Sequence, residues 1–156
     1  KEPVRLSKLL RSYAADLLNA GIASKYTIKT EILPSAETVV IECDARLISR
    51  AINNLVQNSI YHNPQGCNIF LSLDCFQADI SITVADNGVG LSAEKLRDLE
   101  EKPHYMESTD ERLDLRHGLG LLLVRQIVEA HGGRMKIESA EQSGCRTVLT
   151  LKCRKL

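Results

Sequence analysis

An aspartate at the end of an alternating segment is the first residue of this chain whose position suggests chemistry. One parity of residues 79–86 is apolar and is expected to face the core; its members are Ile80, Ile82 and Val84. Asp86 continues that parity, so the pattern directs a carboxylate inward, where an unpaired acid is costly and needs a partner. Aspartate before Asn-Gly is also a common turn residue, so a plain capping role stays open for Asp86.

Two amides on one helical face form a second group with chemical potential. Asn54 and Asn58 are four residues apart in a segment of helical periodicity, so their side chains stack on one face. Tyr61 and His62 extend the same polar stripe. An Asn carbonyl oxygen is a suitable ligand for Mg²⁺, which takes its other ligands from water and phosphate. Such a pair can also simply tie the helix to a neighbouring loop.

Glycines mark two places where the backbone is left bare. Gly88 and Gly90 follow Asp86, as if another group had to approach the chain closely there. Gly118 and Gly120 open a strongly apolar helix, whose free N–H groups and positive dipole end suit a phosphate. The GK[ST] of a P-loop is missing and no dinucleotide GxGxxG follows a strand, so this last signal is weak by itself.

The elements that position these residues predict an α+β domain. Helices are expected over about 6–20, 45–62 and 118–131, and strands over 26–32, 38–43, 67–75, 79–86, 134–140 and 146–153. The first two strands are expected to pair with each other, and the next two to form a hairpin through a turn near Gln77. The order favours a two-layer sandwich in which helices cover one face of a mixed, mostly antiparallel sheet.

Composition limits the alternatives. The 156 residues suggest one domain, 1–156, and 20 basic against 20 acidic residues give no net charge that would favour nucleic acid. Five cysteines, an odd number without a CxxC pair, are expected to be buried free thiols in a reducing compartment. The polar stretch between Ser92 and His117 is too long for an ordinary connection, and we expect a lid that is mobile without ligand.

Three segments together resemble the motif set of one ATP-binding family. NNLVQNSIYHN at 53–63 resembles its N box, DNGVGLS at 86–92 its G1 box and HGLGLLLVRQIVEAHGG at 117–133 its G2 box. Across about residues 2–153 the chain is similar to the Bergerat-type ATP-binding fold of sensor histidine kinases, Hsp90, MutL and type II topoisomerases. The third segment is especially similar to histidine kinases, and the resemblance implies ATP and Mg²⁺ as cofactors.

The resemblance implies a role for each residue near the nucleotide. Asn58 would be the Mg²⁺ ligand, and Asn54 would lie beside the γ-phosphate or a metal-bound water. Asp86 would accept a hydrogen bond from the adenine amino group. Gly88 and Gly90 would let the chain pass beside the base.

In the last two motifs the resemblance implies backbone and water-mediated contacts. Gly118 and Gly120, on either side of Leu119, would place backbone N–H groups against the phosphates. Thr147, in the last strand, would reach adenine through water.

The chain departs from the family pattern at three places. Tyr61 stands where a Lys is usual, with His62 following it, and Arg116 replaces the first glycine of the G2 box. The cation that contacts phosphate is therefore expected to be Arg112 or Arg116. The aromatic F box is reduced to Pro-His-Tyr at 103–105.

The residue at position 54 indicates the branch of the family. Hydrolytic and serine-directed members usually carry a Glu there, and in the hydrolases it is the general base. Asn54 cannot take a proton, so ATP should survive for transfer to a protein. The resemblance therefore implies the catalytic domain of a sensor histidine kinase. An ATP-binding regulatory module without transfer and a serine-directed or hydrolytic relative remain the alternatives.

The same resemblance implies partners for this domain. Its γ-phosphate would go to a histidine on a phosphoacceptor domain of the same parent protein, with a response regulator downstream. The phosphoacceptor and sensor domains are absent from this chain, so it is not expected to phosphorylate itself. The parent is expected to be a homodimer anchored in the bacterial inner membrane, with this domain in the cytoplasm.

Overall fold

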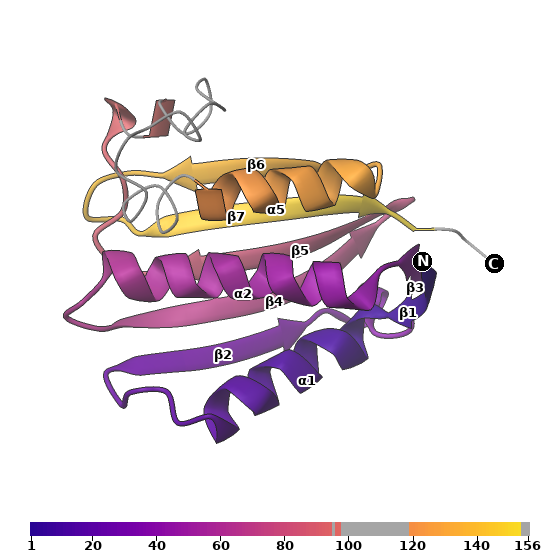
Figure 1. Ribbon diagram of the computed structural model, residues 1–156, viewed down its shortest axis with the longest axis horizontal. Helices are drawn as coiled ribbons and strands as arrows, with labels where there is room; N and C mark the ends of the chain where they lie inside the picture. The colour runs from indigo at the N-terminus through magenta and orange to yellow at the C-terminus, as the bar shows by residue number, and fades with distance from the viewer. Residues whose placement is uncertain (95, 98–118, 154–156) are drawn as a thin grey trace.

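The protein folds into two layers, with helices over one face of a five-stranded sheet (Figure 1). The structure is a computed structural model and describes residues 1–94, 96–97 and 119–153. The helices are α1 (Leu6–Asn19), α2 (Ala45–His62) and α5 (Leu119–Ala130). In the described part of the chain, no helix is long and apolar enough to cross a membrane.

The sheet is mixed and mostly antiparallel. In spatial order its strands are β2 (Tyr26–Ile32), β4 (Cys67–Phe76), β5 (Asp79–Asp86), β7 (Cys145–Lys152) and β6 (Arg134–Ser139). Only the β2–β4 pair among them is parallel, and β4–β5 is the expected hairpin, with Gln77 at a φ of 55° in its turn. The predicted fold class, a helical layer on a mixed, mostly antiparallel sheet, is confirmed.

The predicted pairing of residues 26–32 with 38–43 is wrong. β2 pairs with β4 instead, and β3 (Val40–Cys43) forms a separate two-stranded sheet with β1 (Glu2–Arg5). A 3-10 turn, Pro34–Ala36, replaces the tight turn that a hairpin would need. The four-residue β1 contains a proline and shows no alternation, so no sequence pattern indicates it as a partner.

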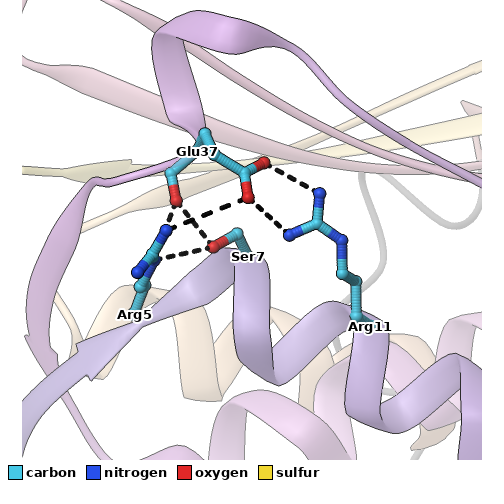
Figure 2. Close-up of polar contacts among 4 residues, drawn as sticks. All are labelled: Arg5, Ser7, Arg11 and Glu37. Carbon is cyan, nitrogen blue, oxygen red and sulfur yellow. Dashed lines mark hydrogen bonds and ion pairs between the residues drawn. The ribbon is translucent and has the colours of Figure 1, made fainter.

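A polar cluster around Glu37 fastens this turn to α1 (Figure 2). The Glu37 carbonyl accepts hydrogen bonds from Arg5 Nε (2.9 Å) and Ser7 Oγ (2.7 Å). The two carboxylate oxygens accept from the Arg11 guanidinium at 2.6 and 2.8 Å. Hydrogen bonding to Arg11 holds the pKa of the Glu37 carboxyl below its usual range. The cluster therefore fixes the path of the chain between β2 and β3.

Helix α2 lies against the sheet, and its ends are defined by polar contacts. At its start Asp44 Oδ1 accepts from the N–H groups of Arg46 and Leu47, so Asp44 is its N-cap. The Asp44 N–H donates to Nε2 of His131, which ties this end to the end of α5. The stripe that faces the sheet is buried; it comprises Ile48, Ile52, Leu55, Val56 and Ser59. These contacts therefore fix which side of α2 faces the sheet, and so where the polar stripe of α2 lies relative to β5.

Candidate active site

Asp86 ends β5 with its side chain directed inward, as the alternation predicts, and only 8% of the residue is exposed. Its Oδ2 accepts a hydrogen bond from Ser59 Oγ on α2 at 2.8 Å. Its Oδ1 accepts from the backbone N–H of Gly88 at 2.9 Å, which is the turn contact that the capping interpretation predicts. A carboxylate oxygen can accept two hydrogen bonds, so both oxygens keep capacity for a further donor.

A small cavity of about 40 Å³ lies beside this carboxylate. Five of the predicted site residues line it, namely Asn58, His62, Asp86, Gly90 and Thr147. Its apolar walls come from α2, α5, β5 and β6 and include Leu55, Val84, Leu121 and Ile137. Pockets for drug-sized ligands hold roughly 300–1,000 Å³, so these walls have to separate before a purine can enter. The structure thus brings together the adenine and metal positions of the prediction in a closed arrangement.

One side-chain atom of Asn58, a residue that lines this cavity, lacks a hydrogen-bond partner among the described residues. Its Nδ2 is buried and has no hydrogen-bond partner among the described residues. An unsatisfied buried amide costs about 1–3 kcal/mol. Because Asn58 lines the cavity, a ligand that brings oxygen atoms into it would remove that cost. The two ends of this side chain suit a Mg²⁺–phosphate group, because Nδ2 can donate to a phosphate oxygen while Oδ1 can bind the metal ion.

Two predicted residues on α2 lie outside the cavity lining. Asn54 is half-buried one helical turn before Asn58. Tyr61 is 36% exposed. Its ring makes an edge-to-face contact with the ring of His62, and the two ring centroids are 5.8 Å apart. Tyr61 is therefore in contact with the cavity residue His62 without lining the cavity itself.

The predicted phosphate-binding turn is described only in part. Leu119 begins α5, and Gly120 is half-buried in its first turn. Arg116 and Gly118 lie outside the described residues, as do Arg112, the F-box remnant at 103–105 and most of the expected lid.

Asn63, at the end of α2, links this helix to the loop after β5, and the sequence analysis did not identify it. It is 3% exposed, and its Nδ2 donates to the Ser59 carbonyl at 2.7 Å. Its Oδ1 accepts from the Val89 N–H at 2.8 Å. A Cβ atom at Gly88 would collide with the Asn63 amide, so a protein contact accounts for this glycine. The available signal was the Asn before Pro64, a pair of residues that is typical of the end of a helix.

Gly90 is required by a second close approach. Its φ is +70°, a conformation in which L side chains are strained, and a Cβ there would collide with the carbonyl of Ala140. The same loop is tied to the β6–β7 turn by Leu91 N–H to Ser139 Oγ and Gln142 N–H to Val89 O, both 2.7 Å. The loop after Asp86 is therefore clamped between the end of α2 and the β6–β7 turn.

The charge of Asp86 acts on two neighbouring thiols. Burial, and then the Asp86 carboxylate, raise the pKa of Cys67 to about 11. The same two causes raise the pKa of Cys145, which lies opposite Asp86 on β7 and lines the cavity. Both groups therefore stay protonated near neutral pH. Within the described residues no cluster of three or more His, Cys, Asp or Glu side chains could hold a metal ion.

A larger depression lies elsewhere and is a different feature. An open groove of about 850 Å³ is lined by β1, α1 and the first half of α2. It contains none of the predicted site residues. The chemistry that the motifs predict is thus concentrated in the small cavity.

With this geometry established, the chain was compared with known proteins. Residues 43–155 match the family described as "Histidine kinase-, DNA gyrase B-, and HSP90-like ATPase". The chain belongs to this family. The match includes all three motif segments, so the family resemblance expected from the sequence is confirmed.

Curated proteins similar to the chain include several that are named as kinases. Histidine protein kinase DivJ of Caulobacter vibrioides is 34% identical over 72% of this chain and 19% of its own length. Sporulation kinase E of Bacillus subtilis is 30% identical over 98% of this chain and 20% of its own length. The chain therefore spans about a fifth of these relatives.

Solved structures show the same fold. The catalytic domain of histidine kinase ThkA superposes with a TM-score of 0.76 at 20% identity, covering 96% of this chain and 93% of that one. Full-length ShkA in complex with AMPPNP gives a TM-score of 0.78 at 20% identity, covering 99% of this chain and 31% of that one. The described architecture is thus that of a histidine kinase catalytic domain.

Proposed function

We propose that this domain binds Mg-ATP in the cavity beside Asp86 and donates the γ-phosphate to a histidine of a phosphoacceptor domain in the same parent protein. The observation that supports it best is the buried Nδ2 of Asn58, which has no hydrogen-bond partner among the described residues; Asn58 lines one cavity with the inward carboxylate of Asp86. A buried acid and an unsatisfied amide are costly in a purely structural role. They suit a site that a ligand completes.

Asp86 serves as the acceptor for the adenine amino group. Ser59 and the Gly88 N–H each donate to one carboxylate oxygen and so fix its orientation. A guanine base would present a carbonyl oxygen at that position and meet the carboxylate acceptor to acceptor, so the site favours adenine. Thr147, buried at 5% exposure on β7, lines the same cavity and would contact the base through water.

Asn58 is the protein ligand of Mg²⁺ in this proposal. The ion would supply charge neutralisation for the phosphate oxygens, which is the chief requirement of phosphoryl transfer. Asn54, one turn earlier on α2, has no proton-accepting group, so water is not activated at this position. These two residues bind and orient the phosphates while leaving the nucleotide intact for transfer.

The relatives support the transfer step and the partners. DivJ and sporulation kinase E carry kinase names, and the ShkA structure was solved with AMPPNP. We further propose, from the family resemblance in the sequence, that the whole parent protein is a homodimeric sensor kinase of the inner membrane. This domain would lie in the cytoplasm and act with a response regulator.

The decisive experiment follows labelled ATP and Mg²⁺ with this chain, with and without the phosphoacceptor helices of its parent. We expect slow turnover by the chain alone and an acid-labile phosphohistidine on the helices when both are present. An acid-stable product would support a serine-directed kinase, and rapid phosphate release would support a hydrolase. ATP binding with no product on a competent acceptor would support a regulatory module.

A further inference from the structure

Two cysteines far apart in the sequence meet at the end of the sheet opposite to Asp86. The Sγ atoms of Cys75, on β4, and Cys153, directly after β7, are 3.7 Å apart. The expectation that all five thiols are buried is wrong for Cys75 and Cys145, which are only half-buried. Seven residues of β5 separate this end from Asp86, a distance of about 23 Å along a strand.

The fold brings the two thiols together around one turn. Ile80 of β5 lies opposite Cys75 on one side and opposite Leu151 on the other, so β5 separates β4 from β7 at this level. Beyond β7 the chain crosses the end of β5, where the Cys153 N–H donates to the Ala78 carbonyl at 2.8 Å. Both Sγ atoms then lie 3.8–3.9 Å from the same Gln77 carbonyl oxygen.

We propose that Cys75 and Cys153 are a reversible oxidation site that forms an intramolecular disulfide on exposure to a small-molecule disulfide of the glutathione type. The Sγ atoms have to approach from 3.7 Å to the ~2.05 Å of a disulfide bond. The resulting bond closes a loop between positions 78 residues apart and fastens the end of β7 to the β4–β5 turn.

The exchange proceeds in two balanced steps. The Cys75 thiolate attacks one sulfur of the small disulfide, which forms a mixed disulfide at Cys75 and releases one small thiolate. The Cys153 thiolate then attacks the Cys75 sulfur, which forms the protein disulfide and releases the second small thiolate. The two cysteines are oxidised, the small disulfide is reduced to two thiols, and the two protein thiol protons pass to solvent or to the leaving groups.

Accessibility assigns the order of these steps. Cys75 is half-buried and adjoins Phe76, which is 73% exposed, so the strand end that carries Cys75 is open to solvent. Cys153 is 8% exposed, which suits a thiol that reacts second with a neighbour already in contact.

The other three cysteines are poor competitors. Burial raises the pKa of both Cys43 and Cys67 to about 11, and it also raises the pKa of Cys145. Because the thiolate is the attacking form, these three groups react slowly near neutral pH. Oxidation should therefore select the pair at the β4–β5 turn.

The test treats the chain with oxidised glutathione, blocks remaining thiols with an alkylating reagent and maps the digested peptides by mass spectrometry. We expect two of the five thiols to be lost, a Cys75–Cys153 linked peptide to appear, and dithiothreitol to reverse both changes. The melting temperature of the oxidised chain should rise, because the bond restricts the unfolded state.

Variants separate the pair from adventitious oxidation. Cys153→Ala removes the resolving thiol, so the glutathione adduct at Cys75 should accumulate at least ~10-fold above wild type. Cys43→Ala, which changes a cysteine outside the pair, should leave the linked peptide unchanged. A stable adduct at Cys75 in wild type, no thiol loss, or a link between other cysteines would overturn the proposal. Mapping of the wild-type chain decides this even if a variant folds poorly.

Discussion

Strand β5 carries an aspartate at each end, and the two carboxylates have opposite surroundings. Asp79 is half-exposed and faces two cations, Lys152 Nζ at 2.7 Å and Arg134 at 3.8 Å. Asp86 is buried and, within the described residues, meets only the neutral donors Ser59 and the Gly88 N–H. Position on the sheet alone therefore does not determine what a carboxylate does.

The two carboxylates differ in how much of their charge and hydrogen-bonding capacity remains available to a ligand. The charge of Asp79 is compensated by side chains that solvent also reaches, and such exposed pairs contribute little to stability. Asp86 is oriented by hydrogen bonds without being neutralised by a described cation, and it adjoins a cavity with a second unsatisfied group. A site for a ligand is thus marked by polar groups that are held in place but incompletely paired.

The largest effect is expected from a substitution in the loop after β5, which holds Asp86 in place. Gly88→Ala forces a Cβ into the Asn63 amide and disturbs its bonds to Ser59 and Val89. We expect the free energy of unfolding to fall by about 3 kcal/mol, because overpacking and lost hydrogen bonds add. Denaturant titration measures this fall, and nucleotide affinity should fall with it.

Gly21→Ala is the matched control for that variant. Its φ is +86°, but a Cβ there would meet no atom within 4 Å. Backbone strain alone should cost about 1 kcal/mol and leave nucleotide affinity unchanged. Equal destabilisation by the two variants would mean that the contact with Asn63 is not what requires Gly88.

Asn58→Ala should separate binding from stability. Removal of the proposed metal ligand should weaken nucleotide binding in Mg²⁺ about 100-fold, equivalent to ~2.7 kcal/mol. The free energy of unfolding without nucleotide should stay constant or rise by ~0.5 kcal/mol, since Ala favours helix and the unsatisfied amide disappears. Calorimetry with Mg-ATP and denaturant titration give the two numbers.

Gln57→Ala, at an exposed neighbouring position of α2, is the control for Asn58→Ala. It should change neither affinity nor its dependence on Mg²⁺. If Asn58→Ala binds Mg-ATP as tightly as this control does, Asn58 is not the metal ligand.

Asp86→Asn tests the carboxylate while preserving its local contacts. The amide oxygen can still accept from the Gly88 N–H, and the amide nitrogen can donate to Ser59 Oγ, so the fold should persist. The adenine amino group, however, would face a less favourable partner, and preference for ATP over GTP should fall about tenfold. Competition binding of the two nucleotides measures the ratio, with Asp79→Asn as the control at the other end of β5. An unchanged ratio in Asp86→Asn would leave Asp86 as a turn residue only.

Local pattern was sufficient for the longer helices and strands and for the direction of Asp86. Alternation over residues 79–86 predicted the buried face of β5, and helical periodicity predicted a helix over 45–62, which is α2. Such features depend on which side of one element is apolar, which the sequence states directly. The placement of five predicted residues around one cavity followed from motifs that resemble a known family.

Pairing and support could not be predicted in the same way. The strand that pairs with residues 26–32 is distant in the sequence, so local pattern does not reveal it. The short β1 gives no periodic signal that would mark it as the partner of β3. Asn63 and Ser59 act through contacts between the end of α2 and the loop after β5, so neither residue's own neighbours in sequence reveal the role. Gly88 was expected to make room for a base, whereas the structure shows a protein amide in that space.

The smallest effect is expected at the compensated end of β5, where Asp79→Asn removes an exposed ion pair. The hydrogen bond from Lys152, helped by the charges of Lys152 and Arg134, lowers the pKa of Asp79 below its ordinary 3.8. A lowered pKa in the folded state contributes stability above the ordinary pKa, and protonation removes that contribution as the pH falls through the folded value. The melting temperature of Asp79→Asn should therefore lie slightly below wild type at pH 7, and the gap should close both below pH 3.8 and at high salt, which screens exposed charges. Scanning calorimetry across pH and salt measures the gap. A gap that persists in acid would show that Asp79 stabilises the strand end by packing and not by its charge.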